Sequence, residues 1–407
     1  PGHAGALMLL TNLCFAAGDV AGSAPHLKAL AVLMPDDAMV LGNLGRAHLA
    51  AGDLAAAAAA FGRVSSMEPA NARALDGMGI VRHREGAYAE AAELHRRATE
   101  VAPGFAATWC NLGIALTDLG RFADGAAALD QALALDPDDA RTRFNRAILD
   151  LMAGNFAAGW QHYEARLAFQ ALPAPSGAAI WDGGRLNGEQ VLLMPEQGFG
   201  DLIQFARFVP HVVARGGRPV LAVPRPMQAL FEAQEWEAEI VDAGVPPDVP
   251  LWCPLMSLGA VLGLRAADIS GAPYLAAPNP MAIDPGGRLR VGMAWAGNPT
   301  HRRDRARSLR LADLLPVLDL QCIHFVNLQV GLREVDSALL AARPELFVEC
   351  PELTDFMETA SVLAGLDLVI SADTAVLHLA GAMGCPAWGL LPFVPDWRWG
   401  ADGKVTT

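Results

Sequence analysis

The sequence predicts an α-helical repeat array followed by two α/β units, each with a parallel sheet. Prolines and glycines recur every 34 residues in the first 170 positions, which indicates stacked helical hairpins. Beyond residue 188, short apolar runs alternate with helical patterns, which is typical of parallel sheets with crossover helices. A segment rich in proline, glycine and alanine, residues 171–188, separates the two regions and predicts a linker.

The composition of the 407-residue chain narrows its class and its partners. It is 53% hydrophobic and 18% charged, which is typical of an ordered globular protein. Its formal net charge of −14 argues against a broad surface for nucleic acid or for an anionic membrane, while leaving room for a local basic pocket. No run of 18 apolar residues predicts a transmembrane helix, and no signal peptide is visible.

The cysteines indicate a reducing environment. Six of them lie far apart without a CxxC pair, at Cys14, Cys110, Cys253, Cys322, Cys350 and Cys385. This spacing predicts reduced thiols rather than a disulfide framework or a zinc site. We therefore expect a cytoplasmic protein with no bound metal.

In the repeat array, a set of prolines and a set of glycines recur independently with the same period. Prolines and glycines stand at Pro1, Pro35, Pro69, Pro103 and Pro137, and at Gly18, Gly52, Gly86, Gly120 and Gly154. Each glycine permits the left-handed turn that ends a first helix, and each proline ends a unit because proline cannot continue a helix. We expect the array to take up residues 1–170 in about five units. The first unit is expected to be incomplete, because the chain begins at a closing proline.

A second set of positions indicates how the two helices of a unit pack. Gly45, Gly79 and Gly113 recur one period apart and would let paired helices approach closely. The pattern resembles the tetratricopeptide repeat, which implies stacked hairpins that bind a protein or glycan partner in a groove. The alternative is a scaffold without a partner. The last unit changes into GWQHYEARLAF, residues 159–169, which we expect to form a capping helix.

The region after the linker predicts two Rossmann-like domains, at residues 189–280 and 281–407. Strands are expected at VLLM (191–194), PVLAV (219–223), RVGMAW (290–295), HFVNLQ (324–329), LDLVIS (366–371) and AWGLLP (387–392). One helix is expected over residues 201–216. The two domains would face each other across a cleft, with ligands at the carboxyl ends of the strands.

The stretch PEQGFGDLIQFARFVP, residues 195–210, follows a predicted strand and opens a helix. Gly198 and Gly200 match the start of a dinucleotide fingerprint, but Ile203 replaces the third glycine. Asp201 would repel a pyrophosphate at the helix N-terminus. A nicotinamide oxidoreductase is therefore disfavoured. Asp201 is either the N-cap of this helix or a general base held by the glycine loop, and the two roles are compatible.

Two stretches of the last domain contain groups that bind anions. In DLVISADTAVLHLAGAMGCPAWGLLPF (367–393), Asp373 and Thr374 stand where a helix begins, and His378 lies one turn beyond Thr374. The alternative is a capped helix with a buried histidine. In WAGNPTHRRDRARSLRL (295–311), a cluster of arginines follows a strand, and arginine forks suit diphosphate oxygens. The alternative there is a solvated basic surface.

Together, GDLIQFARFVP, WAGNPTHRRD and SADTAVLHLAGAMGCPAWGLLP resemble the heptosyltransferase-type enzymes of glycosyltransferase family 9. Nearly the whole chain is similar to bacterial tetratricopeptide-repeat proteins that carry such a domain. The resemblance implies a GT-B fold, in which two Rossmann-like domains bind a nucleotide-diphosphate sugar as substrate. It implies sugar transfer to a protein or glycan acceptor without a cofactor or metal.

The resemblance also implies roles for residues of this chain. The family's glycine-loop aspartate acts as catalytic base, and it corresponds to Asp201. The family's diphosphate element corresponds to Asp373, Thr374, Ala375 and His378, with alanine in place of the family's glycine. Further donor contacts are implied for Asn298, Arg302, Arg303, Arg307 and, near the nucleoside, Gln329.

The end of the sequence departs from the family pattern. GT-B chains usually continue into a C-terminal helix that crosses back onto the first domain, whereas this chain ends eight residues after Trp399. We therefore expect the last domain to be truncated. The alternative function is a repeat scaffold whose degenerate transferase domain binds partners without turnover.

Overall fold

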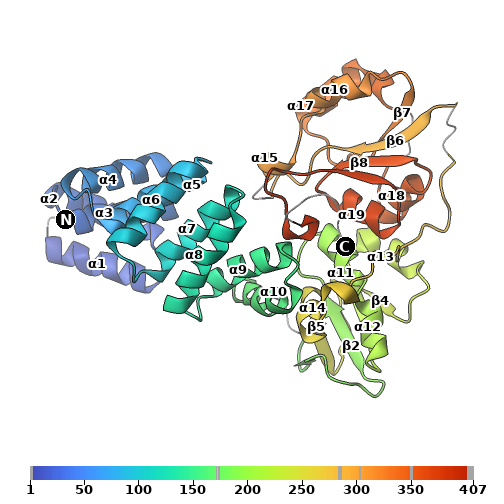
Figure 1. The fold of residues 1–407 in the computed structure, drawn as a ribbon, viewed down its shortest axis with the longest axis horizontal. Coiled ribbons are helices and arrows are strands. Elements are labelled where there is room, and N and C mark those ends of the chain that lie inside the picture. The colour runs from blue at the N-terminus through green and yellow to red at the C-terminus, as the bar shows by residue number, and fades with distance from the viewer. Residues whose placement is uncertain are drawn as a thin grey trace. The chain divides into compact units, whose positions relative to one another are not determined.

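The computed structural model describes residues 3–170, 172, 175–282, 287–301, 304–348 and 352–400 of the chain. The chain divides into two compact units, Pro1–Asp150 and Leu151–Thr407. The first unit is helical, and the second contains two parallel sheets with their helices (Figure 1). The predicted fold class, a helical repeat array followed by Rossmann-like α/β domains, is confirmed.

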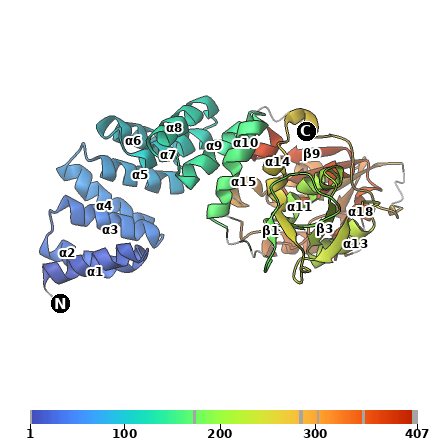
Figure 2. The same cartoon turned by 90° about the horizontal axis from the view of Figure 1, so that it is seen from below.

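The first unit consists of helical hairpins that follow the period of the sequence (Figure 2). Its helices are α1 (Ala4–Ala16), α2 (Ala24–Leu33), α3 (Ala38–Ala50), α4 (Leu54–Met67), α5 (Ala72–Arg84), α6 (Tyr88–Val101), α7 (Ala106–Asp118), α8 (Phe122–Leu135) and α9 (Ala140–Met152). The predicted turn glycines are left-handed, with φ between 75° and 84° at Gly18, Gly52, Gly86, Gly120 and Gly154. Any residue with a Cβ is strained there, which explains the glycine period.

The second glycine register follows from close packing within each hairpin. A Cβ at Gly45 would lie 2.7 Å from the ring of Phe61, and a Cβ at Gly79 would lie 2.5 Å from the ring of His95. Gly113 approaches its partner helix in the same way. Since no Cβ fits at these distances, the paired helices can pack as they do only over glycine.

The second unit opens with the short helix α10 (Phe156–Tyr163) and the 3-10 segment η2 (Glu164–Ala168). A helix lies in this stretch as predicted, and Trp160, Tyr163 and Arg166 are buried, while a role as cap of the repeat array stays a prediction. Trp160 packs edge-on against Phe205 of the α/β region, with ring centroids 5.9 Å apart. The helix that follows the last repeat is therefore part of the core of the α/β unit.

The first sheet has five parallel strands in the order β1-β5-β2-β3-β4. They are β1 (Ala179–Ile180), β2 (Gln190–Met194), β3 (Arg218–Val223), β4 (Glu239–Asp242) and β5 (Leu251–Pro254), and the helices are α11 (Phe199–Ala206), α12 (Val209–Ala214), α13 (Arg225–Glu232) and α14 (Leu258–Val261). Central β2 pairs with β5 through Val191 and Leu251, and with β3 through Leu192 and Val220. β1 lies within the segment expected as a linker, where the buried Trp181 follows it.

The second sheet has four parallel strands in the order β7-β6-β8-β9. They are β6 (Leu289–Ala294), β7 (Ile323–Asn327), β8 (Leu368–Ala372) and β9 (Ala387–Leu390), and the helices are α15 (Asp304–Arg307), α16 (Leu311–Leu318), α17 (Glu334–Ala342), α18 (Phe356–Leu363) and α19 (Ala375–Ala382). The strand order reverses between β6 and β8, as it does between β2 and β5. Loops at the carboxyl ends of strands separate at such a point and commonly hold ligands.

The helix expected over residues 201–216 is two helices. α11 ends at Ala206, and α12 begins at Val209 with Pro210 in its first turn. Proline is tolerated in the first turn of a helix but cannot donate the hydrogen bond that would continue the preceding one. The prediction of a single helix was wrong because it gave too little weight to this proline.

The carboxyl ends of the two sheets meet through α11 and α19, which Figure 1 shows next to each other between the sheets. Tyr274 ties the two helices together. Its hydroxyl donates a hydrogen bond to the carbonyl of Ile203 at 3.0 Å, and its N–H donates to the carbonyl of Ala382 at 2.8 Å. The two Rossmann-like sheets therefore share a contact zone at the ends where ligands are expected.

Candidate functional site

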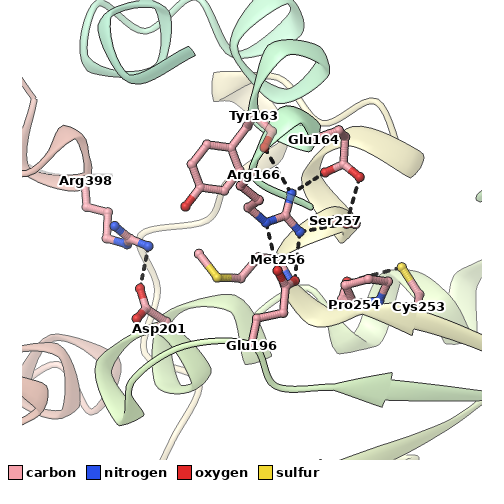
Figure 3. A network of polar contacts seen from close by, with 10 residues as sticks. All are labelled: Tyr163, Glu164, Arg166, Glu196, Asp201, Cys253, Pro254, Met256, Ser257 and Arg398. Carbon is pink, nitrogen blue, oxygen red and sulfur yellow. Dashed lines mark hydrogen bonds and ion pairs between the residues drawn. The ribbon is translucent and has the colours of Figure 1, made fainter. Parts of the chain in front are cut away.

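Asp201 is the third residue of α11, and both of its carboxylate oxygens have partners. The N-cap of α11 is Gly198, so the N-cap alternative for Asp201 was wrong in position. Oδ2 of Asp201 accepts a hydrogen bond from the Gly198 N–H at 3.1 Å, which caps the helix from within its first turn. Oδ1 accepts a hydrogen bond from Arg398 (Figure 3). The carboxylate is thus held at the mouth of the helix.

Gly200 is the point at which α11 meets α19. A Cβ at Gly200 would lie 2.6 Å from Cδ2 of His378, whereas a Cβ at Gly198 would meet only Oδ2 of Asp201, at 3.6 Å. Neither glycine has a positive φ. The second glycine of the loop is therefore required by the approach of another helix rather than by a left-handed turn.

We expect Gly200→Ala to destabilise the second unit by about 1–3 kcal/mol, the usual cost of overpacking. His378 cannot move aside freely, because its ring stacks on Trp399 with centroids 5.0 Å apart. Thermal unfolding followed by tryptophan fluorescence measures the effect. Gly198→Ala is the matched control and should show a smaller change, so equal changes in the two variants would contradict the packing argument.

Helix α19 begins directly after β8, with Thr374 as N-cap and Ala375 as its first residue. The Thr374 hydroxyl lies 3.1 Å from the Ser371 hydroxyl. The N–H groups in the first turn of a helix have no partner within it, and the helix dipole adds a partial positive charge. This end of α19 therefore favours an anion.

Asp373 and His378 form a pair beside this helix end. Nε2 of His378 lies 3.6 Å from Oδ1 of Asp373, and both side chains are largely buried. Although burial acts to raise the pKa of the Asp373 carboxyl, His378, then Trp399 and Arg307, hold that pKa below its usual value. Asp373 is therefore an anion, and a phosphate bound nearby would depend on the Arg307 guanidinium and the helix dipole to offset the negative charge of Asp373.

The loop after β6 contributes Arg307. Its Nη1 donates a hydrogen bond to the backbone carbonyl of Asp373 at 3.2 Å, which places the guanidinium beside the start of α19. A Cβ at Gly297 would lie 2.7 Å from Nη2 of Arg307, so this glycine makes room for it. Nε of Arg307 is buried without a hydrogen-bond partner among the residues that the structure describes. A bound anion or water would satisfy such a donor.

Gln329 supports the loop after β6. Its Oε1 accepts hydrogen bonds from the N–H groups of Trp295 and Ala296, at 2.9 and 2.8 Å. Its Nε2 donates to the carbonyls of Ala296 and Val330, both at 2.9 Å. Both amide hydrogens are thus used within the protein. The expected contact of Gln329 with a nucleoside stays a prediction.

The remaining residues predicted to bind the nucleotide sugar are Asn298, Arg302 and Arg303. Oδ1 of Asn298 accepts hydrogen bonds from the N–H and hydroxyl of Thr300, at 3.0 and 2.9 Å, which closes a tight turn. Arg302 and Arg303 lie outside the described residues. The predicted residues that the structure brings together are Gly200, Asp201, Arg307, Asp373, Thr374, Ala375 and His378.

Two side chains of this site, Arg398 and Trp399, were not predicted from the sequence. Both lie in the 3-10 segment η6 (Trp397–Trp399). Arg398 pairs with Asp201, 197 positions earlier in the chain, and Trp399 stacks on His378 with 22° between the ring planes. The sequence signal was the closely spaced WRW, but no local pattern links it to residues so distant.

Two features are absent from the part of the chain that the structure describes. No group of three or more His, Cys, Asp or Glu side chains there is arranged to hold a metal ion. No helix there combines the length and the apolar character that a membrane crossing needs.

The repeat region and the α/β region match different protein families. Residues 43–104 and 82–143 match models of the tetratricopeptide repeat. Residues 338–396 match the model of glycosyltransferase family 9 (heptosyltransferase). The chain combines tetratricopeptide repeats with a segment that matches glycosyltransferase family 9. The family 9 segment includes β8, α19 and β9, and so covers Asp373 and His378, whereas Asp201 and Arg307 lie outside it.

Individual relatives are more distant. Protein FlbA of Caulobacter vibrioides is 29% identical over 273 residues, which cover 57% of this chain and 45% of FlbA. The chain thus spans less than half the length of this curated relative. MamA of Desulfovibrio magneticus RS-1 has 21% identity and a TM-score of 0.33, over 40% of this chain and 92% of MamA. A thermophilic TPR protein of Thermus thermophilus has 21% identity and a TM-score of 0.37, over 41% of this chain and 91% of its own.

Proposed function

We propose that the second unit is a GT-B-type glycosyltransferase that moves a sugar from a nucleotide-diphosphate sugar to a hydroxyl of a protein or glycan acceptor. The observation that carries this proposal is the meeting of α11 and α19 at Gly200 and His378. A carboxylate, Asp201, lies on one side of this contact, and a helix end that favours anions lies on the other. Sugar transfer requires a base and a leaving-group site in this relation.

In this proposal the donor diphosphate binds at the N-terminus of α19, beside Arg307 and His378. Asp201 takes the proton from the acceptor hydroxyl as its oxygen attacks the anomeric carbon. The new C–O bond forms while the bond from the anomeric carbon to the diphosphate oxygen breaks, and the nucleoside diphosphate leaves with the electron pair. Arg307 and the dipole of α19 stabilise the negative charge that builds on the leaving group.

We further propose that the tetratricopeptide repeats of the first unit bind the acceptor. Stacked hairpins of this kind offer an extended surface for a partner, which supports the assignment. We place the reaction in the cytoplasm, which is consistent with the free thiols of all five cysteines that the structure describes.

Calorimetric titration with ADP-, UDP-, GDP- and dTDP-sugars tests the donor site. We expect one nucleotide class to bind. Arg307→Ala and His378→Ala should weaken binding by about 10- to 100-fold, because hydrogen bonds to charged groups contribute about 1.5–3 kcal/mol. Arg310→Ala is the matched control, since Arg310 is an exposed arginine paired with Asp313. A folded chain that binds none of the four classes would contradict the proposal and favour the repeat scaffold without turnover.

A further inference from the structure

The C-terminal segment Trp397–Trp399, here called the WRW segment, touches both sides of the contact between α11 and α19. Each of its three side chains has a different partner: Trp397 packs on α10 and α11, Arg398 binds Asp201, and Trp399 stacks on His378. The family 9 match ends at residue 396, so it assigns nothing to this segment. Its contacts nevertheless include the two side chains on which the proposed function depends.

Trp397 anchors the segment to the first sheet's side of the unit. Its side chain is buried, with 6% of the residue exposed. Its ring packs edge-on against Trp160 at 5.5 Å, Tyr163 at 5.9 Å and Phe205 at 6.4 Å between centroids. Four rings in edge-to-face contact define one favourable orientation, so the start of the segment has a fixed position.

Arg398 is held between two carboxylates. Its side chain is 8% exposed, and its guanidinium binds Asp201 through Nη2 and Asp396 through Nη1, the latter at 2.7 Å. The guanidinium also lies over the ring of Trp397, 4.6 Å from the centroid. Because the guanidinium is a rigid planar fork, it cannot rotate without losing one of these partners. It therefore fixes Oδ1 of Asp201, while the Gly198 N–H fixes Oδ2.

This arrangement orients Asp201 and still leaves it able to act. A carboxylate has about four acceptor positions, and the contacts of Asp201 with Gly198 and Arg398 use two of them. One position therefore remains on each oxygen for the hydroxyl of an acceptor. Trp399, the next residue, orients His378 in a similar way, because its ring covers one face of the imidazole.

We propose that Arg398 and Trp399 are positioning residues that set the placement of Asp201 relative to His378, with Trp397 as their anchor. The proposal rests on the proposed function, because it gives Asp201 the role of base. The two positioning residues are adjacent in one 3-10 turn, so a displacement of Arg398 is transmitted to Trp399 and from there to the imidazole. Asp201 and His378 come from separate sheets, and the segment connects them directly.

NMR of the His378 imidazole tests this coupling without any turnover. The resonances are assigned by their loss in His378→Gln, and the stacked indole should displace them by its ring current. Arg398→Met removes a contact of Asp201 rather than one of His378. We nevertheless expect it to shift the His378 resonances, through the adjacent Trp399. Arg265→Met should leave them unchanged, because Arg265 forms an exposed pair with Asp268.

Enzyme kinetics test the same proposal through the rate of the reaction. The probe is release of the nucleoside diphosphate from whichever nucleotide sugar binds in calorimetry, with water as acceptor. Arg398→Met should lower kcat by about 100-fold, the effect of misplacing a reacting group by about 1 Å, with little change in KM. Arg398→Lys should lose less, because the ammonium keeps the charge between the carboxylates.

The outcomes separate the two proposals. Unchanged His378 resonances together with unchanged kcat in Arg398→Met would overturn the positioning role. If the wild-type chain releases no nucleoside diphosphate, the proposed function fails, while the His378 resonances still decide whether the segment couples the two side chains. Should Arg398→Met not fold, Arg398→Gln, which also removes the charge between Asp201 and Asp396, carries the same comparison, and unchanged His378 resonances with unchanged kcat there overturn the proposal.

Discussion

Asp201→Asn is expected to lower sugar transfer by about 100- to 10,000-fold, the usual contribution of a general base. Asparagine has nearly the same shape and can still accept the hydrogen bond from the Gly198 N–H, so α11 keeps its cap. It lacks the basicity to take a proton from the acceptor. Because Arg307 and His378 are unchanged, calorimetry should show that nucleotide-sugar binding is retained, while release of the nucleoside diphosphate falls.

Asp313→Asn is a closely matched control for this experiment. Asp313 is also the third residue of a helix, α16, and its Oδ2 also accepts a hydrogen bond from the N-cap N–H, that of Arg310. Arg310 pairs with its other oxygen at 2.7 Å. Since Asp313 is exposed and remote from α19 in the chain, its variant should keep full activity. An equal loss in both variants would show that the removed carboxylates support helices rather than chemistry.

The repeat array was predictable in detail because each structural requirement recurs several times along the sequence. Five turn glycines in one register all have a positive φ. Three further glycines in a second register all lack space for a Cβ. A local requirement that recurs every 34 residues is visible without any knowledge of the fold. The start of α19 was predictable for a related reason, since a strand, a Thr N-cap and a helix follow one another directly.

The contacts that complete the site were not predictable, because they join distant parts of the chain. Arg398 meets Asp201 across 197 positions, and only the packing of the two sheets brings them together. β1 was missed because two residues carry too little pattern, and its pairing with β5 comes from residues 251–252. Gln329 was expected to face a ligand, but its four backbone contacts became visible only once β6 and β7 were side by side.

Arg166→Met is expected to lower the free energy of unfolding of the second unit by about 3–5 kcal/mol, the cost of leaving a buried charge unpaired. The side chains of Arg166 and Glu196 are 2% and 0% exposed. Nε and Nη2 of Arg166 each donate to one oxygen of Glu196 at 2.8 Å (Figure 3). Although burial acts to lower the pKa of Arg166, Glu196 and Glu164 raise it above its usual value. The variant would remove the charge that offsets Glu196.

Urea unfolding followed by tryptophan fluorescence measures this loss in the second unit, because eight of the nine tryptophans lie after Asp150. Arg265→Met removes an exposed arginine that pairs with Asp268 and should cause little change. The double variant Arg166→Met/Glu196→Gln should recover a large share of the lost stability, since it leaves no charge at Glu196. A double variant as unstable as the single one would show that Arg166 acts through packing instead.

The same pair bears on the chemistry, because Glu196 lies on the short connection between β2 and α11, and Asp201 lies in the first turn of α11 just beyond it. Arg166 holds Glu196 at the start of this connection, and Arg398 holds Asp201 just beyond its end. The Met256 N–H also donates to Glu196, at 3.0 Å, so the carboxylate ties the loop after β2 to the one after β5. We therefore expect Arg166→Met to lower transfer as well as stability. Full transfer by this variant under native conditions would show that Arg398 and the Gly198 cap are sufficient to place Asp201.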